Sequence, residues 1–166
     1  MNQNDEWYTP EYVLNLAREV LGTIHLDPAS SDIANERVNA EIYFTKEDNG
    51  LLLPWEGTVW CNPPYSATLI KKYCNKVYEE YSKGHISEAI VLTNSGTDTL
   101  WNQPLAKGTQ VYTLGRISFL TPEGAEKGKG GRGQCFTYFG SKHKKFIEVF
   151  TRNNFCWCPN QHLIRE

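Results

Sequence analysis

This sequence of 166 residues lacks several features that would place it in a specialised class. It has no apolar run near the ~20 residues that cross a bilayer, and its first residues, Met1–Glu6, do not have the pattern of a signal peptide. Its net charge is only −2, which taken alone argues against a nucleic-acid-binding protein. The remaining composition, 40% hydrophobic and 22% charged, is ordinary for a globular protein. We therefore expect a single domain over residues 1–166 that buries a substantial core.

The sequence lacks the even, regularly spaced cysteines of a disulfide framework, since its five cysteines are odd in number and scattered along the chain. This usage argues against a disulfide framework and indicates reduced thiols in a cytoplasmic compartment. Cys156 and Cys158 form the one close pair, which we interpret as a strand with both thiols on one face. Zinc binding is the alternative, but neither a second cysteine pair nor a histidine cluster accompanies them. We expect no metal site.

Glycine is concentrated in one segment, residues 123–134, which holds five glycines among charged residues. The segment is not a P-loop, because no Gly-Lys-Ser/Thr sequence leads into a helix. Since it has too few apolar residues to bury, we expect a mobile Gly/Lys-rich loop at about 123–134. Loops of this length in compact domains are usually functional or disordered.

Acidic and basic residues are unevenly divided along the chain. Residues 1–66 carry 3 Lys and Arg against 11 Asp and Glu, whereas residues 67–166 carry 14 against 8. The basic excess includes Lys127, Lys129, Arg132, Lys142, Lys144, Lys145 and Arg152. A phosphate backbone is one partner for such a surface, and an ordinary solvated face of lysines is the other interpretation.

The most informative stretch is Thr58-Val-Trp-Cys-Asn-Pro-Pro-Tyr-Ser66. It predicts a short apolar strand that stops at Asn62, because two successive prolines cannot donate to a sheet ladder and each fixes its own φ. Asn62 offers a side-chain carbonyl, Pro63 offers a backbone carbonyl, and Tyr65 offers a flat ring after Pro64. Two acceptors and a stacking face suit a planar aromatic amine. The alternative is a proline-rich turn with a buried tyrosine.

Helices and strands are predicted to alternate up to about residue 115. Apolar periodicity predicts helices, with Thr9 and Ser66 as caps of the first two, over 10–22, 66–83, 97–107 and 144–151. Short apolar runs predict strands over 24–26, 41–44, 58–61, 88–94, 109–115, 116–120, 135–139 and 155–158. This order predicts an α/β fold whose mostly parallel sheet ends in an antiparallel hairpin. Asp27 follows the first strand, at the position where such sheets bind ligands.

Together these elements resemble the small phage-type DNA N6-adenine methyltransferases. Asn62-Pro63-Pro64-Tyr65 looks like the catalytic motif of amino-group methyltransferases that use S-adenosylmethionine. The resemblance extends, through about residue 120, to Trp7-Tyr-Thr-Pro10, Leu26-Asp-Pro-Ala29, the turn from Asp48 to Leu51, and Gly115-Arg116. The four-residue motif also occurs in enzymes that methylate glutamine or guanine amines, but its combination with the N-terminal Trp-x-Thr-Pro element is much more specific. The resemblance implies a Rossmann-like methyltransferase fold.

The resemblance also implies site residues. The catalytic residues, which would hold and stack on the adenine, would be Asn62, Pro63, Pro64 and Tyr65. The residues that contact S-adenosylmethionine would be Trp7, Thr9, Pro10, Asp27, Pro28, Ala29 and Asp48. Within that set, Asp27 would lie near the methionine end of the cofactor and Asp48 near its adenosine. One departure is Ser30-Ser31-Asp32, which stands where the wider superfamily has a glycine-rich turn.

DNA is the partner that the resemblance implies, and the protein would act in the cytoplasm, that of the host cell if a phage encodes it. The residues expected to engage DNA are Lys127, Lys129, Arg132 and Arg116. Two alternatives stay open: an amine methyltransferase that acts on RNA or on a protein glutamine, and a catalytically inactive nucleic-acid-binding relative. A monomer and a homodimer both fit the sequence.

Overall fold

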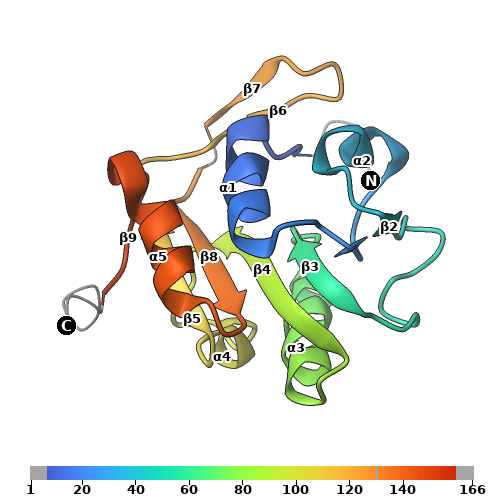
Figure 1. Cartoon of the computed structure of the whole chain (residues 1–166). Helices are drawn as coiled ribbons and strands as arrows, with labels where there is room; N and C mark the ends of the chain where they lie inside the picture. The colour runs from blue at the N-terminus through green and yellow to red at the C-terminus, as the bar shows by residue number, and fades with distance from the viewer. Residues whose placement is uncertain (1–6, 130, 160–166) are drawn as a thin grey trace.

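The computed structural model describes residues 7–129 and 131–159. Within them a seven-stranded sheet runs in the order β2-β1-β3-β4-β8-β5-β9 (Figure 1). Its strands are β1 (Leu26–Asp27), β2 (Ile42–Tyr43), β3 (Gly57–Cys61), β4 (Ile86–Asn94), β5 (Thr109–Thr113), β8 (Gln134–Phe139) and β9 (Cys156–Trp157). The sheet is therefore the central layer of the described molecule.

The sheet is parallel on one side and antiparallel on the other. The pairs β1–β2, β1–β3 and β3–β4 are parallel, whereas β8 pairs antiparallel with both β4 and β5, and β9 pairs antiparallel with β5. Because two reversals restore the direction, β5 points the same way as β4. The predicted α/β class is confirmed, and β5 with β8 forms the predicted antiparallel hairpin across a long connection.

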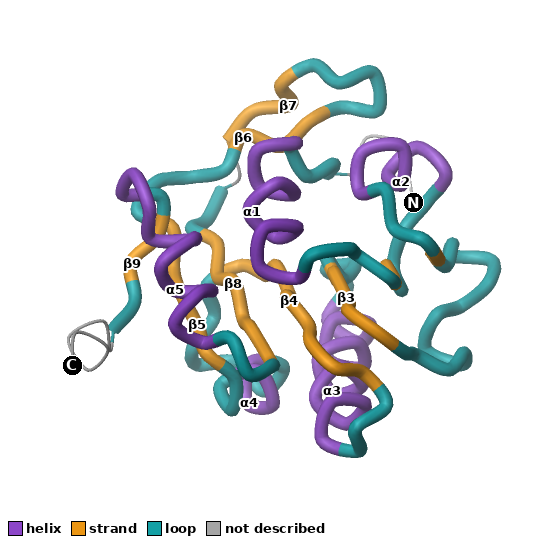
Figure 2. Tube along the Cα trace, viewed as in Figure 1, coloured by secondary structure: helices purple, strands orange, loops and turns teal. Residues whose placement is uncertain are grey.

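Helices cover both faces of the sheet (Figure 2). On one face lie α1 (Glu11–Leu21) and α5 (His143–Thr151), and on the other lie α3 (Ala67–Ser82) and the short α4 (Asn102–Leu105). Alternate residues of β4 point to opposite faces of the sheet and pack into two separate hydrophobic clusters. Ile90 and Leu92 belong to the cluster under α1 and α5, and Ala89 and Val91 belong to the cluster under α3. This two-sided burial explains why the segment reads as a continuous apolar run.

The two long predicted helices are confirmed, and their ends follow from local chemistry. α1 ends at Gly22, which takes φ 80° and whose N–H bonds back to the Arg18 carbonyl. α3 begins after Ser66, whose hydroxyl accepts from the Leu69 amide at 3.3 Å. A smaller helix, α2 (Asp32–Val38), begins after Ser31 in the same way, with the hydroxyl accepting from the Ala34 amide at 3.1 Å.

The predicted helix over 97–107 is wrong for most of its length. Only Asn102–Leu105 is helical, and the preceding residues form a turn in which the Thr99 amide donates to the Gly96 carbonyl at 3.1 Å. Pro104 explains the shortness, because a proline has no N–H to continue a helix and is tolerated only in the first turn.

Residues 118–129, called the arm below, project from the sheet as a second, two-stranded unit (Figure 1). β6 (Ser118–Leu120) pairs antiparallel with β7 (Glu126–Lys129). The prediction of a loop over 123–134 is therefore wrong where β7 and the start of β8 fall within it. Strand pairing uses backbone groups and needs no apolar side chains. Gly128, with φ 112°, lies opposite Phe119 beside a register shift, as at a β-bulge.

Two further observations limit the chemistry of the described residues. Their helices include none that is long and apolar enough to cross a membrane. The five cysteines are buried free thiols, and no group of three or more metal-ligating side chains occurs in this part of the chain. Burial raises the pKa of the Cys74 and Cys135 thiols to about 12, so these thiols stay protonated near neutral pH.

Candidate active site

Polar residues gather at one edge of the sheet, where neighbouring parallel strands end. Asp27 ends β1, Asn62 follows β3 and Asn94 ends β4. The registers Leu26 with Val59 and Cys61 with Val91 bring these ends level with one another. In Figure 1 the arrowheads of β3 and β4 point toward the end of the molecule that carries the arm. This is the edge at which open α/β sheets bind ligands.

Asp27 is a buried carboxylic acid, with only 3% of its surface exposed. Its Oδ1 accepts from the Ala29 amide at 3.2 Å, and the Ser30 side chain is a second partner. Desolvation outweighs these hydrogen bonds and raises the pKa of the carboxyl to about 7. A cation beside Asp27 would favour the ionised form, so the position suits a positively charged ligand group.

The loop after Asp27 is held rigidly from two sides. The Tyr73 hydroxyl on α3 donates to the Pro28 carbonyl at 3.3 Å. From the other side Gly50 packs so closely that a Cβ there would lie 2.2 Å from the Pro28 oxygen. Trp55 fixes Gly50 in turn, since its Nε1 donates to the Gly50 carbonyl at 2.8 Å. These contacts hold the backbone of Pro28 and Ala29 in place in a loop that contains no glycine.

Asp48 lies on the surface in the turn that leads to Gly50. Its Oδ2 accepts from both the amide and the hydroxyl of Thr45, each at 2.8 Å. These hydrogen bonds lower the pKa of the carboxyl. Asp48 therefore closes the turn whose Gly50 packs on Pro28. Its influence on the site is indirect and passes through that turn.

Asn62 is half-buried, and its amide nitrogen is already engaged. Nδ2 donates to Thr9 Oγ1 at 3.4 Å, a long hydrogen bond between residues far apart in sequence. Among the described residues none donates to Asn62 Oδ1. Pro63 is buried and Pro64 half-buried after it, so the turn is stiff behind the amide. The amide thus offers its carbonyl oxygen to a ligand.

Tyr65 presents its ring at the surface while its hydroxyl is held. The residue is 41% exposed, which excludes the alternative of a buried tyrosine in a structural turn. Its hydroxyl end is desolvated beside the backbone amide of Asn94, and burial of this end raises the pKa of the phenol. A ring fixed at its tip and open on its flank is suited to stacking on a flat ligand.

The N-terminal segment ties the arm to the end of β3. Tyr8 pairs with Leu120 of β6 through two backbone hydrogen bonds of 2.9 and 3.2 Å. Trp7 packs edge-on against Phe119, with 5.7 Å between ring centroids. Thr9 and Pro10 are buried next to this pairing. The prediction that Thr9 caps α1 is wrong, because the helix starts one residue later and the Thr9 hydroxyl accepts from Asn62 instead.

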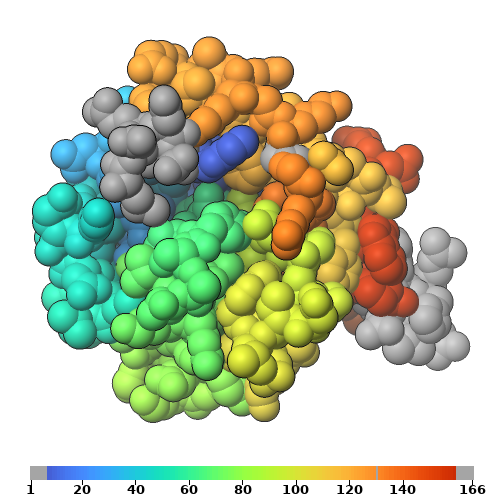
Figure 3. Space-filling model, turned by 180° about the vertical axis from the view of Figure 1, so that it is seen from behind, coloured from blue at the N-terminus to red at the C-terminus, as the bar shows by residue number. Residues whose placement is uncertain are grey.

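The predicted DNA-contacting cations fall into two groups. Lys127 lies over the Trp7 ring, 4.7 Å from its centroid, while Lys129 and Arg132 are exposed on the arm and on its return to β8. Seen from behind, the orange residues of the arm lie above the green residues that follow β3 (Figure 3). Arg116 is apart from them, on the exposed connection between β5 and β6.

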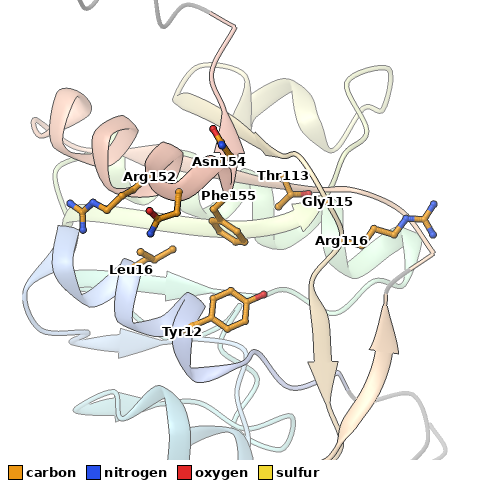
Figure 4. A pocket seen from close by; sticks show the side chains of 9 residues that line it. Tyr12, Leu16, Thr113, Gly115, Arg116, Arg152, Asn154 and Phe155 are labelled. Atoms are coloured by element: carbon orange, nitrogen blue, oxygen red, sulfur yellow. The ribbon is translucent and has the colours of Figure 1, made fainter.

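Arg116 lines a pocket of about 580 Å³ between α1, the β5–β6 connection and the short helix η2 (Arg152–Asn154). Tyr12, Leu16 and Phe155 form its apolar wall, and the side chains of Arg116 and Arg152 point away from each other (Figure 4). Arg152 is paired with Glu19 at 3.0 Å. The pocket contains none of the residues at the ends of β1 and β3.

Three polar residues near the site were not predicted. Gln134 Nε2 donates to Asn94 Oδ1 at 3.0 Å, at the pairing of β8 with β4. Gln134 Oε1 and Thr93 Oγ1 are buried, and neither has a hydrogen-bond partner among the described residues. An unpaired buried acceptor is costly, so these two atoms reduce the stability that the pairing of β4 with β8 provides. The available signal was a buried strand, 88–94, that ends in Thr-Asn.

The residues at the sheet edge and on the arm also fall within a stretch that is similar to a known protein family. A family model described as DNA N-6-adenine-methyltransferase (Dam) matches residues 1–157. The matched stretch contains the polar residues at the sheet edge and the whole of the arm. No curated protein and no solved structure matches the chain.

Proposed function

Because the chain belongs to the DNA N-6-adenine-methyltransferase (Dam) family, we propose that it transfers the methyl group of S-adenosylmethionine to the N6 amino group of adenine in DNA. The observation that carries this proposal is the pair formed by the Asn62 amide, whose Nδ2 is engaged by Thr9, and the exposed ring of Tyr65. A Rossmann-like methyltransferase fold is part of the proposal. The parallel order β2-β1-β3-β4 and the antiparallel β8 between β4 and β5 support it.

In the proposed reaction, the sheet edge makes the adenine amine a better nucleophile. The N6 lone pair is delocalised into the ring, and hydrogen bonds from the amine to Asn62 Oδ1 and the Pro63 carbonyl favour a more tetrahedral nitrogen. Tyr65 stacks on the base and holds it in line. When bound, S-adenosylmethionine would supply a methyl group on a sulfonium whose leaving group is a neutral thioether. Positioning can supply most of the acceleration, and the N6 proton passes to water after the N–C bond forms.

The cofactor would lie along the first strand-end loop. The buried carboxyl of Asp27, with its pKa raised to about 7, fits the positively charged methionine end. The rigid backbone of Pro28 and Ala29 would contact the cofactor beside it, and Trp7, Thr9 and Pro10 would wall it from the side of the arm. Asp48, in the turn that packs on Pro28 through Gly50, would lie nearer the adenosine.

DNA would approach from the side of the arm. The exposed cations Lys129 and Arg132 and the neighbouring Lys127 would contact the phosphate backbone, and Arg116, on the β5–β6 connection, would contact it from a separate position. The target adenine must leave the base stack to reach Asn62, either by flipping out of a duplex or from a single strand.

A methyl-transfer assay tests the proposal directly. The purified protein would be incubated with methyl-tritiated S-adenosylmethionine and duplex DNA, adenine-free DNA, RNA or a mixed protein substrate. We expect label in adenine-containing DNA alone, recovered as N6-methyladenine after nuclease digestion. Label in RNA or in protein glutamine would instead identify a different amine methyltransferase. Failure of the protein to bind S-adenosylmethionine in a calorimeter would identify an inactive relative.

A further inference from the structure

The Thr9 side chain is turned toward the end of β3 and away from the helix that follows it. A threonine just before a helix commonly caps it, but α1 begins at Glu11 and its N-cap position, Pro10, has no side-chain hydrogen bond. Thr9 is only 7% exposed, and its Oγ1 accepts from Asn62 Nδ2 at 3.4 Å. The Thr9 hydroxyl therefore accepts a hydrogen bond from Asn62 and does not cap α1.

This contact matters because an asparagine amide has two nearly isosteric orientations. The proposed reaction needs Asn62 Oδ1 to face the adenine amine, so Nδ2 must point the opposite way. A half-buried N–H without an acceptor is unfavourable, and Thr9 Oγ1 supplies that acceptor. With Thr9 present, both ends of the amide are satisfied at the moment the amine donates to Oδ1.

Thr9 is itself held in place on both sides. The preceding residue, Tyr8, is paired with Leu120 of the arm, and the following Pro10 has its φ fixed by the proline ring. Trp7 adds a ring contact with Phe119. The backbone on either side of Thr9 is thus restrained, by its pairing with the arm and by the proline ring, through contacts that do not involve Asn62.

We propose that Thr9 is a positioning residue, which acts through Asn62 by fixing the orientation of its amide for the adenine amine. This inference rests on the proposed function, in which the shape of Thr9 helps to wall the cofactor, and it assigns a second task to the Thr9 hydroxyl. Loss of the acceptor leaves a desolvated N–H, so the rate of methyl transfer should fall by roughly 10- to 100-fold. Because a substitution by valine keeps the side-chain shape that would wall the cofactor, the affinity for S-adenosylmethionine should stay near the wild-type value.

The test compares Thr9→Val, which keeps the shape and removes the acceptor, with Thr9→Ser, which keeps the acceptor. Single-turnover methyl transfer, KM for DNA and Kd for S-adenosylmethionine would be measured for each. We expect Thr9→Val to lose rate alone and Thr9→Ser to restore most of it. Thr151→Val is the matched control, since its hydroxyl makes one hydrogen bond, to Ile147 O at 2.7 Å, at the end of α5.

A second measurement needs no variant of Thr9. The side-chain amide of Asn62, assigned by nitrogen NMR, should exchange its hydrogens more slowly than exposed asparagines do. Rapid exchange, a Thr9→Val enzyme with the wild-type rate, or a loss of cofactor affinity without loss of rate would each overturn the inference. A wild-type protein that makes no N6-methyladenine would instead defeat the proposed function, and with it the inference.

Discussion

Two turns at the edge of the sheet begin alike and are built differently. Asp27-Pro28 follows β1 and Asn62-Pro63 follows β3, each a polar residue and a proline at the carboxyl end of a parallel strand. The Asp27 turn is buried and held from both sides, by Tyr73 and Gly50. The Asn62 turn instead leads into a half-buried Pro64 and an exposed Tyr65.

The difference in burial has a different consequence at each turn, because Asp27 can carry a charge and Asn62 cannot. A buried carboxylate is costly, and Asp27 responds with a pKa raised to about 7, which a cationic ligand would lower again. An amide is neutral and can remain half-buried beside an open ring at little cost. The same local pattern thus supports two proposed tasks, binding of the cationic cofactor at Asp27 and activation of a neutral amine at Asn62.

The largest effect is expected at the open turn. Asn62→Ala removes the acceptor for the amine, so the single-turnover rate of methyl transfer should fall by about 10³-fold, the size typical for a lost transition-state hydrogen bond. Asn75→Ala, on the partly exposed side of α3, is the matched control and should keep the wild-type rate. A wild-type rate in Asn62→Ala would show that Asn62 takes no part in methyl transfer.

Because Asp27 titrates in the buried turn, the affinity for S-adenosylmethionine should depend on pH. Below pH 7 a cationic ligand must displace the proton that Asp27 holds, so the affinity should weaken as pH falls, by up to about 100-fold at pH 5. Calorimetric titration between pH 5 and pH 7.5 measures this. In Asp27→Asn no proton is displaced, so the affinity should be weaker at pH 7.5 and flat across the range. An unchanged slope in that variant would place the titrating group elsewhere.

Gly50 tests whether the buried turn needs its rigid support. In Gly50→Ala the Cβ would collide with the Pro28 carbonyl, and relief of that clash should cost about 1–3 kcal/mol of the free energy of unfolding. Urea unfolding measures the loss. Gly131→Ala, where a Cβ meets nothing within 4 Å, is the control. Equal free energies of unfolding for the two variants would mean that the 46–50 turn shifts to accommodate the Cβ at little cost.

The smallest effects are expected on the arm, which lies outside both turns. Lys129→Gln and Arg132→Gln should each weaken DNA binding uniformly across sequences and reduce the slope of log K against log salt by about one. Fluorescence anisotropy at several salt concentrations measures the slope. Lys83→Gln, at the far end of α3, should leave it unchanged. If neither arm variant changed this slope, the DNA would have to bind at another surface.

The sequence alone predicted the local structure of the Asn62 turn better than the contacts that surround this turn. The change from apolar residues to Asn-Pro-Pro predicted where β3 ends, and Ser66 predicted where α3 begins, because both are local effects. The Thr9–Asn62 contact could not be predicted, since it depends on how a segment 53 residues away is packed. Local capping rules assigned the Thr9 hydroxyl to α1, and tertiary structure overrode them.

The arm and the helix before β5 show the same limit. Glycines and charges over 123–134 predicted no regular structure, yet β7 forms there because β6 offers its backbone edge. The apolar spacing over 97–107 predicted a helix that Pro104 confines to one turn. The burial of Asp27, and with it the raised pKa, also depends on neighbours from α3 and the 46–50 turn that no local pattern specifies.

The division of tasks between the two turns is tested most directly by one calorimetric comparison. Binding of S-adenosylmethionine would be measured at pH 7.5 for wild type, Asn62→Ala and Asp27→Asn. The account predicts near wild-type affinity for Asn62→Ala and an affinity about tenfold or more weaker for Asp27→Asn, which lacks the charge-assisted contact. Lost binding in Asn62→Ala together with wild-type binding in Asp27→Asn would contradict it.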